Sequence, residues 1–91
     1  MKTIAILIAD DHPMMREALK MALEGEPDLR VIGEANNGQE AVRLAGELNP
    51  DVVLMDLLMP GMTGLEAVAA LQQSHPEIKI MVVTSLEDKD K

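Results

Sequence analysis

Residues 51–64 read DVVLMDLLMPGMTG, a short apolar run that ends in an acidic residue and is followed by a proline–glycine pair. Asp56 comes directly after four apolar residues, Val52–Met55. Removing a carboxylate from water costs free energy unless a partner compensates for the lost hydration. The stretch therefore predicts a buried strand that ends at an acidic site.

Three further apolar runs occur along the chain, and segments with helical periodicity separate all four. This alternation is typical of βαβ units and predicts the α/β class. The second run is mixed in character, so we expect it at a sheet edge, whereas the others are almost continuously apolar, as in parallel strands covered on both faces. We expect an open, doubly wound parallel sheet. Its strands are Ile4–Ala9, Leu29–Ala35, Val52–Met55 and Ile78–Val83.

Helix signals lie between these runs. The first helix is expected to begin at Pro13, a residue suited to a first helical turn. The second has Asn37 as its cap with Glu40 three residues later, and the third repeats this pair with Thr63 and Glu66. Periodicity places one apolar face on the first helix. That face consists of Met15, Ala18, Leu19, Ala22 and Leu23.

Composition narrows the class of protein. The 91 residues suit one domain, 1–91, and 47% apolar content supports a modest core. Sixteen acidic against eight basic residues give a net charge of −8, which disfavours direct binding to nucleic acid or to anionic membranes. There is no cysteine, and no apolar run approaches membrane-spanning length. We expect a cytoplasmic protein that neither spans nor binds a membrane.

Acidic and hydroxyl side chains follow three of the expected strands. Asp10 and Asp11 follow the first, Asp56 follows the third and Thr84 follows the fourth. In open α/β sheets, sites form where the carboxyl ends of strands converge. If the first and third strands are neighbours, three carboxylates share one region and repel one another unless a cation holds them. Mg²⁺ suits a site of few carboxylates and a phosphate.

Each of these residues also has a purely structural explanation. Asp10 and Asp11 would cap the first helix, and Asp56 would end its strand in solvent, because aspartate is common at caps and turns. Their coincidence with a threonine at a strand end favours a site. His12 and His75 both precede prolines and are interpreted as loop residues. No glycine-rich phosphate loop, Ser-His-Asp pattern or zinc-ligand spacing is present.

Four segments together resemble the receiver domain of bacterial two-component response regulators, in particular the NarL/FixJ-like (LuxR-type) group. They are IADDHPMMREAL (8–19), GEANNGQEAV (33–42), PDVVLMDLLMPGMTGLEA (50–67) and IKIMVVTS (78–85). The resemblance implies a flavodoxin-like (CheY-like) fold with sheet order 2-1-3-4. It also implies two-component phosphorelay signalling with a sensor histidine kinase as partner.

The same resemblance implies a role for each site residue. Asp56 would be the phosphoacceptor, a signalling function rather than that of an enzyme with a separate substrate. Asp11, Asp56 and the backbone carbonyl of Leu58 would hold Mg²⁺, and Asp10 would act through a water. Thr84 would be the switch hydroxyl. Phosphoryl transfer depends chiefly on positioning and charge neutralisation, which a carboxylate beside Mg²⁺ provides.

The chain departs from the family at its end. It stops at residues 87–91, where a fourth helix is expected, so we expect a receiver truncated after the fourth strand. The fifth strand, the last two helices and the lysine of that strand would be missing, and neither Lys89 nor Lys91 matches that lysine. DNA binding would belong to an absent downstream domain. The alternative is a degenerate receiver-like interaction module that is not phosphorylated. A phosphatase is disfavoured because Leu58 stands where a second aspartate would act.

The truncation also implies self-association. An unpaired fourth strand is an apolar edge open to pairing with another chain. Loss of the last helix would uncover part of the first helix around Leu19, and exposed apolar patches usually find a partner. We therefore expect a homodimer or exchanged assembly through one of these surfaces.

Overall fold

The computed structural model describes residues 3–57, 59 and 64–83. Strands and helices alternate along these residues, as the apolar pattern predicts. The elements are β1 (Ile4–Ala9), α1 (Pro13–Glu24), β2 (Leu29–Ala35), α2 (Gly38–Leu48), β3 (Val52–Asp56), α3 (Gly64–Ser74) and β4 (Lys79–Val83).

The four strands form one parallel sheet in the order β2-β1-β3-β4. The predicted order 2-1-3-4 is therefore confirmed, as is the edge position of β2. At its carboxyl end β1 lies between two neighbours, because Ala9 pairs with Ala35 on one side and with Met55 on the other. The carboxyl ends of the three strands thus lie at the same edge of the sheet, with β3 one residue longer there.

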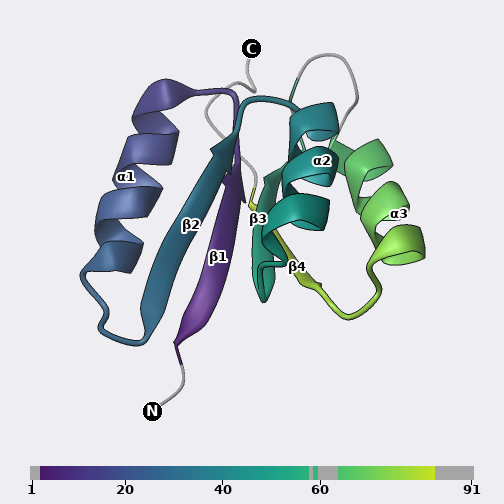
Figure 1. The fold of residues 1–91 in the computed structure, drawn as a ribbon. Helices are drawn as coiled ribbons and strands as arrows, with labels where there is room; N and C mark the ends of the chain where they lie inside the picture. The colour runs from purple at the N-terminus through teal and green to yellow at the C-terminus, as the bar shows by residue number, and fades with distance from the viewer. Residues whose placement is uncertain (1–2, 58, 60–63, 84–91) are drawn as a thin grey trace.

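Helices cover both faces of the sheet, with α1 on one face and α2 and α3 on the other (Figure 1). Side chains alternate between the faces along β1. Leu7 packs in the core under α2 and α3, whereas Ile6 and Ile8 pack toward α1 with Leu54. The larger core, under α2 and α3, consists of Leu7, Ala9, Ala35, Ala41, Ala45, Val53, Met55, Met59, Ala67, Leu71 and Ile78. This arrangement confirms the doubly wound architecture.

The start of α2 follows the predicted capping pattern with one difference. The Oδ1 atom of Asn37 accepts a hydrogen bond of 2.8 Å from the backbone N–H of Glu40. The Glu40 carboxylate in turn accepts from the N–H of Asn36, at 2.7 Å, one residue before the cap. The predicted cap at Thr63 lies outside the described residues.

The predicted apolar face of α1 is only partly covered. Leu19 and Leu23 pack against the core around Ile8, but Ala18 and Ala22 are exposed. No residue of α1 is buried. Within the part of the chain that the structure describes, β1 and β2 are the elements that α1 packs against. The helix therefore buries a narrow strip rather than the whole predicted face.

Among the described residues, β4 is partly exposed, as expected of an apolar edge strand, and is not covered on both faces as its apolar sequence alone indicates. Met81 is 59% exposed and Val82 is 49% exposed, although both are apolar. Among the described strands, β4 pairs with β3 alone. An apolar strand sequence indicates a preference for burial and does not specify which element covers it.

Candidate functional site

The register of the sheet brings the predicted acidic residues together. Ala9 of β1 pairs with Met55 of β3, so the next residue of each chain segment, Asp10 and Asp56, reaches the same edge. One side-chain oxygen from each of Asp10, Asp11 and Asp56 and a ring nitrogen of His12 all lie within 4.8 Å of one another. The three carboxylates that the sequence indicated thus form one cluster, hereafter the acidic cluster.

Asp10 is held by both of its peptide groups. Its N–H donates to the carbonyl of Ala35 at 3.0 Å, and its carbonyl accepts from Nη1 of Arg16 at 2.8 Å. Its side chain is 5% exposed, and Oδ1 accepts from the backbone N–H of His12 at 2.8 Å. Asp10 is therefore a buried carboxylate fixed by the loop that follows β1.

Asp56 is buried at the end of β3, and only 3% of it is exposed. It is the last residue of the strand and pairs with Val83 of β4. The structural explanation that Asp56 ends its strand in solvent is therefore wrong. The helix-cap explanation for Asp10 and Asp11 also fails, because the N-cap residue of α1 is His12, whose side chain makes no capping hydrogen bond.

A glycine allows α3 to begin against the backbone of Asp56. A Cβ atom on Gly64 would collide with the carbonyl oxygen of Asp56 and with the Cα atom of Leu57. Because both obstacles are backbone atoms, neither can move aside as a flexible side chain would. Gly64 thus sets the closeness of α3 to the acidic cluster.

His12 is the exposed member of the group that forms around the acidic cluster. Its Nδ1 is 3.0 Å from Asp10, 3.1 Å from Asp11 and 3.7 Å from Asp56, and 54% of its side chain is exposed. The hydrogen bond to Asp10 raises the pKa of His12 above its ordinary value of 6.5, and the charge of Asp11 raises it further, with smaller contributions from the charges of Asp10 and Asp56. Partial burial opposes this rise in pKa.

The loop assignment of His12 was correct, but its contact with the carboxylates was missed. The available signal was its position directly after Asp10 and Asp11. His75, the other predicted loop histidine, lies 3.6 Å from Glu77.

The donor set suits a hard divalent cation. Oδ1 of Asp11 is buried and accepts no hydrogen bond, although it faces Nδ1 of His12. Carboxylate oxygens are preferred ligands of Mg²⁺ and Ca²⁺. The residues present therefore fit a cation such as Mg²⁺. Leu58 and Thr84, the other two predicted site residues, lie outside the described residues.

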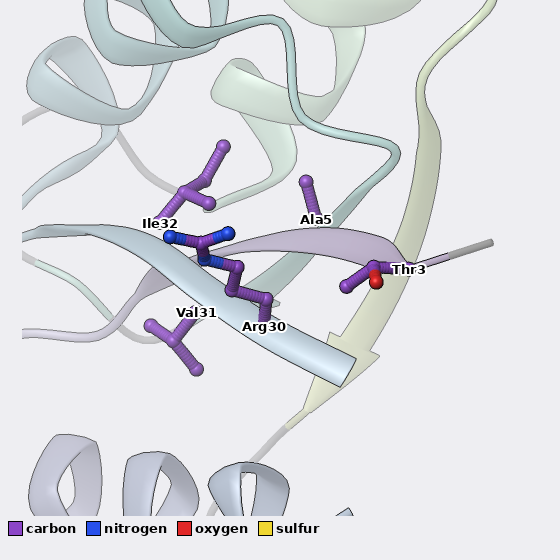
Figure 2. A pocket seen from close by; sticks show the side chains of 5 residues that line it. All are labelled: Thr3, Ala5, Arg30, Val31 and Ile32. Carbon is purple, nitrogen blue, oxygen red and sulfur yellow. The ribbon is translucent and has the colours of Figure 1, made fainter. Parts of the chain in front are cut away.

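A separate hollow of about 560 Å³ lies at the opposite end of the sheet. Figure 2 shows that its side chains come from the beginnings of β1 and β2, with Arg30 as the charged group. Its lining residues are Thr3, Ala5, Arg30, Val31 and Ile32. Since no acidic residue lines it, this hollow is not part of the acidic cluster.

A comparison with protein-family models agrees with the fold and with the acidic cluster. The family model for the response regulator receiver domain matches residues 6–91, and the chain belongs to that family. Its function class is accordingly two-component signalling. Among the described residues, no helix is both long and apolar enough to cross a membrane.

Similar proteins are transcriptional response regulators. The chain is 52% identical over 88 residues to the transcriptional regulatory protein LiaR of Bacillus subtilis, covering 97% of this chain and 42% of LiaR. It is 44% identical over 89 residues to the response regulator protein VraR of Staphylococcus aureus, covering 97% of this chain and 43% of VraR. The chain thus spans less than half the length of either relative.

Solved structures show the same fold. The response regulator domain of Thermotoga maritima CheB superposes with a TM-score of 0.89 at 38% identity, covering 97% of this chain and 65% of that one. A LuxR-family two-component response regulator from Aurantimonas gives a TM-score of 0.87, also at 38% identity, covering 91% of this chain and 59% of that one. The NarL/FixJ-like assignment is therefore confirmed, and the degenerate alternative finds no support in these similarities.

Proposed function

We propose that Asp56 accepts a phosphoryl group from a phosphohistidine of a sensor histidine kinase, with Mg²⁺ held by Asp10, Asp11 and Asp56. The observation that carries the proposal is the gathering of three carboxylates at the end of β3, within 4.8 Å of one another. Carboxylates this close repel, so a cation stabilises the arrangement. Leu58 through its carbonyl and Thr84 as the switch hydroxyl belong to the same proposal.

Asp56 and the cation would have different roles in the transfer of the phosphoryl group. A carboxylate oxygen of Asp56 forms a bond to phosphorus while the bond between phosphorus and the donor imidazole breaks, and the electron pair leaves with that imidazole. Because a carboxylate is already ionised, it needs no general base. Mg²⁺, when bound, neutralises charge on the transferred group. Burial of Asp56 restricts water around the reacting oxygen.

His12 contributes a second positive group when it is protonated. Its Nδ1 lies within 3.7 Å of all three carboxylates, and its side chain is the most exposed of the cluster. Asp10 and Asp56 are both buried, so His12 is the group of the acidic cluster that a phosphodonor would meet first. We assign His12 to the entrance of the site rather than to the transfer step itself.

The wider role follows from the relatives. LiaR is named a transcriptional regulatory protein, so we propose that this domain controls transcription in the cytoplasm through a DNA-binding domain outside the 91 residues. The net charge of −8 is consistent with no direct contribution of this segment to DNA binding.

We also propose that the 91-residue chain self-associates through β4. Met81 and Val82 are both exposed on a strand that pairs with β3 alone among the described elements. A strand of this kind offers unpaired backbone groups together with apolar side chains. The partner that matches it is β4 of a second copy.

The experiment that tests the proposed function is transfer from acetyl phosphate in the presence of Mg²⁺, followed by intact-mass spectrometry. We expect one phosphoryl adduct on the wild-type chain and none on Asp56→Asn.

A further inference from the structure

We propose that Arg16 is a positioning residue for the acidic cluster, holding the backbone of Asp10 so that its carboxylate faces the cation. This inference rests on the proposed function, because it assigns a role in the same metal site. We do not assign Arg16 a catalytic role, since its hydrogen bonds go to the backbone carbonyl of Asp10 and to Asn36.

The position of Arg16 in α1 explains how it reaches the site. It lies one turn into the helix that begins at Pro13. Side chains on a helix lean toward its N-terminus, so the guanidinium extends back over the loop between β1 and α1. There Nη1 donates to the carbonyl oxygen of Asp10 at 2.8 Å.

Other contacts hold the guanidinium in place. Nη1 also donates to Oδ1 of Asn36, and Nε lies 3.3 Å from a carboxylate oxygen of Glu34. The side chain of Arg16 is only 18% exposed. Glu34 also pairs with Lys20, because Nζ of Lys20 lies 3.4 Å from the other carboxylate oxygen of Glu34. The side chain of Arg16 is therefore largely buried, and its three partners lie within β2 or directly after β1 and β2.

These contacts leave little freedom to Asp10. Its N–H is bonded to Ala35 and its carbonyl to Arg16, so the peptide groups on both sides of its Cα are fixed. The remaining freedom is side-chain rotation, which the N–H of His12 restricts through Oδ1. Arg16 thus supplies the one side-chain contact in this set that holds the Asp10 backbone.

Arg16 also connects two loops at the same edge of the sheet. Asn36 follows β2, and its N–H donates to Glu40 in the first turn of α2. The guanidinium therefore joins the loop after β1 to the start of α2. Partners of metal ligands commonly change metal affinity by about 10- to 100-fold when they are removed.

The test compares Mg²⁺ binding by wild type, Arg16→Ala and the control Lys20→Ala, each followed by backbone amide NMR shifts. Lys20→Ala removes a basic side chain that shares Glu34 but has no contact with Asp10. We expect Arg16→Ala to raise the dissociation constant for Mg²⁺ about tenfold or more. Lys20→Ala should stay within about twofold of wild type, as expected for an exposed ion pair.

A second readout separates positioning from general damage. If Arg16 acts by placing Asp10, saturating Mg²⁺ should restore the rate of phosphorylation by acetyl phosphate in Arg16→Ala to near the wild-type value. A loss of rate that saturating Mg²⁺ does not repair would overturn the positioning role. Arg16→Lys keeps the charge, but a single ammonium cannot keep the Nε contact with Glu34 together with the two hydrogen bonds of Nη1, so it should give an intermediate dissociation constant.

Two further outcomes decide the inference. If Arg16→Ala does not fold by circular dichroism, Arg16→Lys and Asn36→Ala, which removes one acceptor of the guanidinium, carry the same comparison. Wild-type affinity in those variants, with Asp11→Ala losing binding, would overturn the role of Arg16 and leave the metal site intact. Absence of any Mg²⁺ response in wild type would instead overturn the metal site, and the role of Arg16 with it.

Discussion

Nδ1 of His12 lies 3.0 Å from Oδ1 of Asp10, which places an imidazole that can carry charge directly against a buried carboxylate. The contact joins the N-cap residue of α1 to the residue that follows β1. It makes the acidic cluster sensitive to the protonation of one exposed ring.

The first prediction concerns pH in the absence of metal. The folded state raises the pKa of His12 above 6.5, first through the hydrogen bond to Asp10 and then through the charge of Asp11. His12 therefore contributes stability that is fully present below the unfolded pKa and is lost as pH rises through the folded pKa. His12→Ala should lower the free energy of unfolding at about pH 6 and have less effect at about pH 9.

Urea unfolding of wild type and His12→Ala, with a chelator present and across that pH range, measures the difference in the free energy of unfolding. His75→Ala is the control for loss of an imidazole outside the acidic cluster. A deficit of His12→Ala that grows with rising pH would refute the linkage.

The second prediction concerns Gly64. Gly64→Ala should destabilise the fold by about 2 kcal/mol, because the new Cβ meets backbone atoms of Asp56 and Leu57 that cannot yield without moving α3. Gly25→Ala is the matched control. At Gly25 the nearest atom to a new Cβ is 3.5 Å away and the backbone is helical, so alanine should be neutral or slightly stabilising. Equal unfolding midpoints for the two variants would contradict the close approach.

The third prediction concerns the cation. Asp11→Ala should abolish the Mg²⁺-dependent NMR shifts around the acidic cluster, because Oδ1 of Asp11 is buried without a hydrogen bond and suits a cation. Glu47→Ala removes the same charge from the exposed side of α2 and should leave those shifts unchanged. Equal responses in wild type and Asp11→Ala would remove Asp11 from the site.

The fourth prediction concerns self-association. Size exclusion with light scattering should show a dimer of the 91-residue chain, and Val82→Lys should dissociate it by placing a charge on the exposed strand. Leu65→Lys adds the same charge to an exposed apolar position of α3 and should leave the dimer intact. A wild-type monomer at all concentrations up to millimolar would rule out the interface.

Much of the fold could be predicted from the apolar pattern because parallel strands covered by helices need continuous burial. The end of β1 at Ala9 and the approach of Asp10 to Asp56 follow from strand neighbours and from the common direction of parallel strands. Once the order 2-1-3-4 is expected, these carboxylates must meet at one edge.

Other features depend on side-chain reach, which the sequence pattern does not contain. His12 faces the acidic cluster because its extended backbone turns the chain between β1 and α1, with Asp10 accepting its N–H. In the sequence, Arg16 has the pattern of an ordinary polar residue of an amphipathic helix. Its contact with the Asp10 carbonyl can be recognised only from the structure. The exposure of Met81 likewise depends on what packs nearby, not on hydrophobicity.

The central claim is that Asp56 accepts the phosphoryl group with help from a cation at the acidic cluster. The most direct measurement is intact-mass spectrometry of the chain after incubation with acetyl phosphate, with Mg²⁺ and with a chelator. We predict one phosphoryl adduct that requires Mg²⁺ and is absent from Asp56→Asn. Asp51→Asn should retain the adduct, because Asp51 precedes β3 and accepts from Ala5 at the opposite end of the sheet. An adduct that persists in Asp56→Asn, or one that forms equally well in the chelator, would contradict the account.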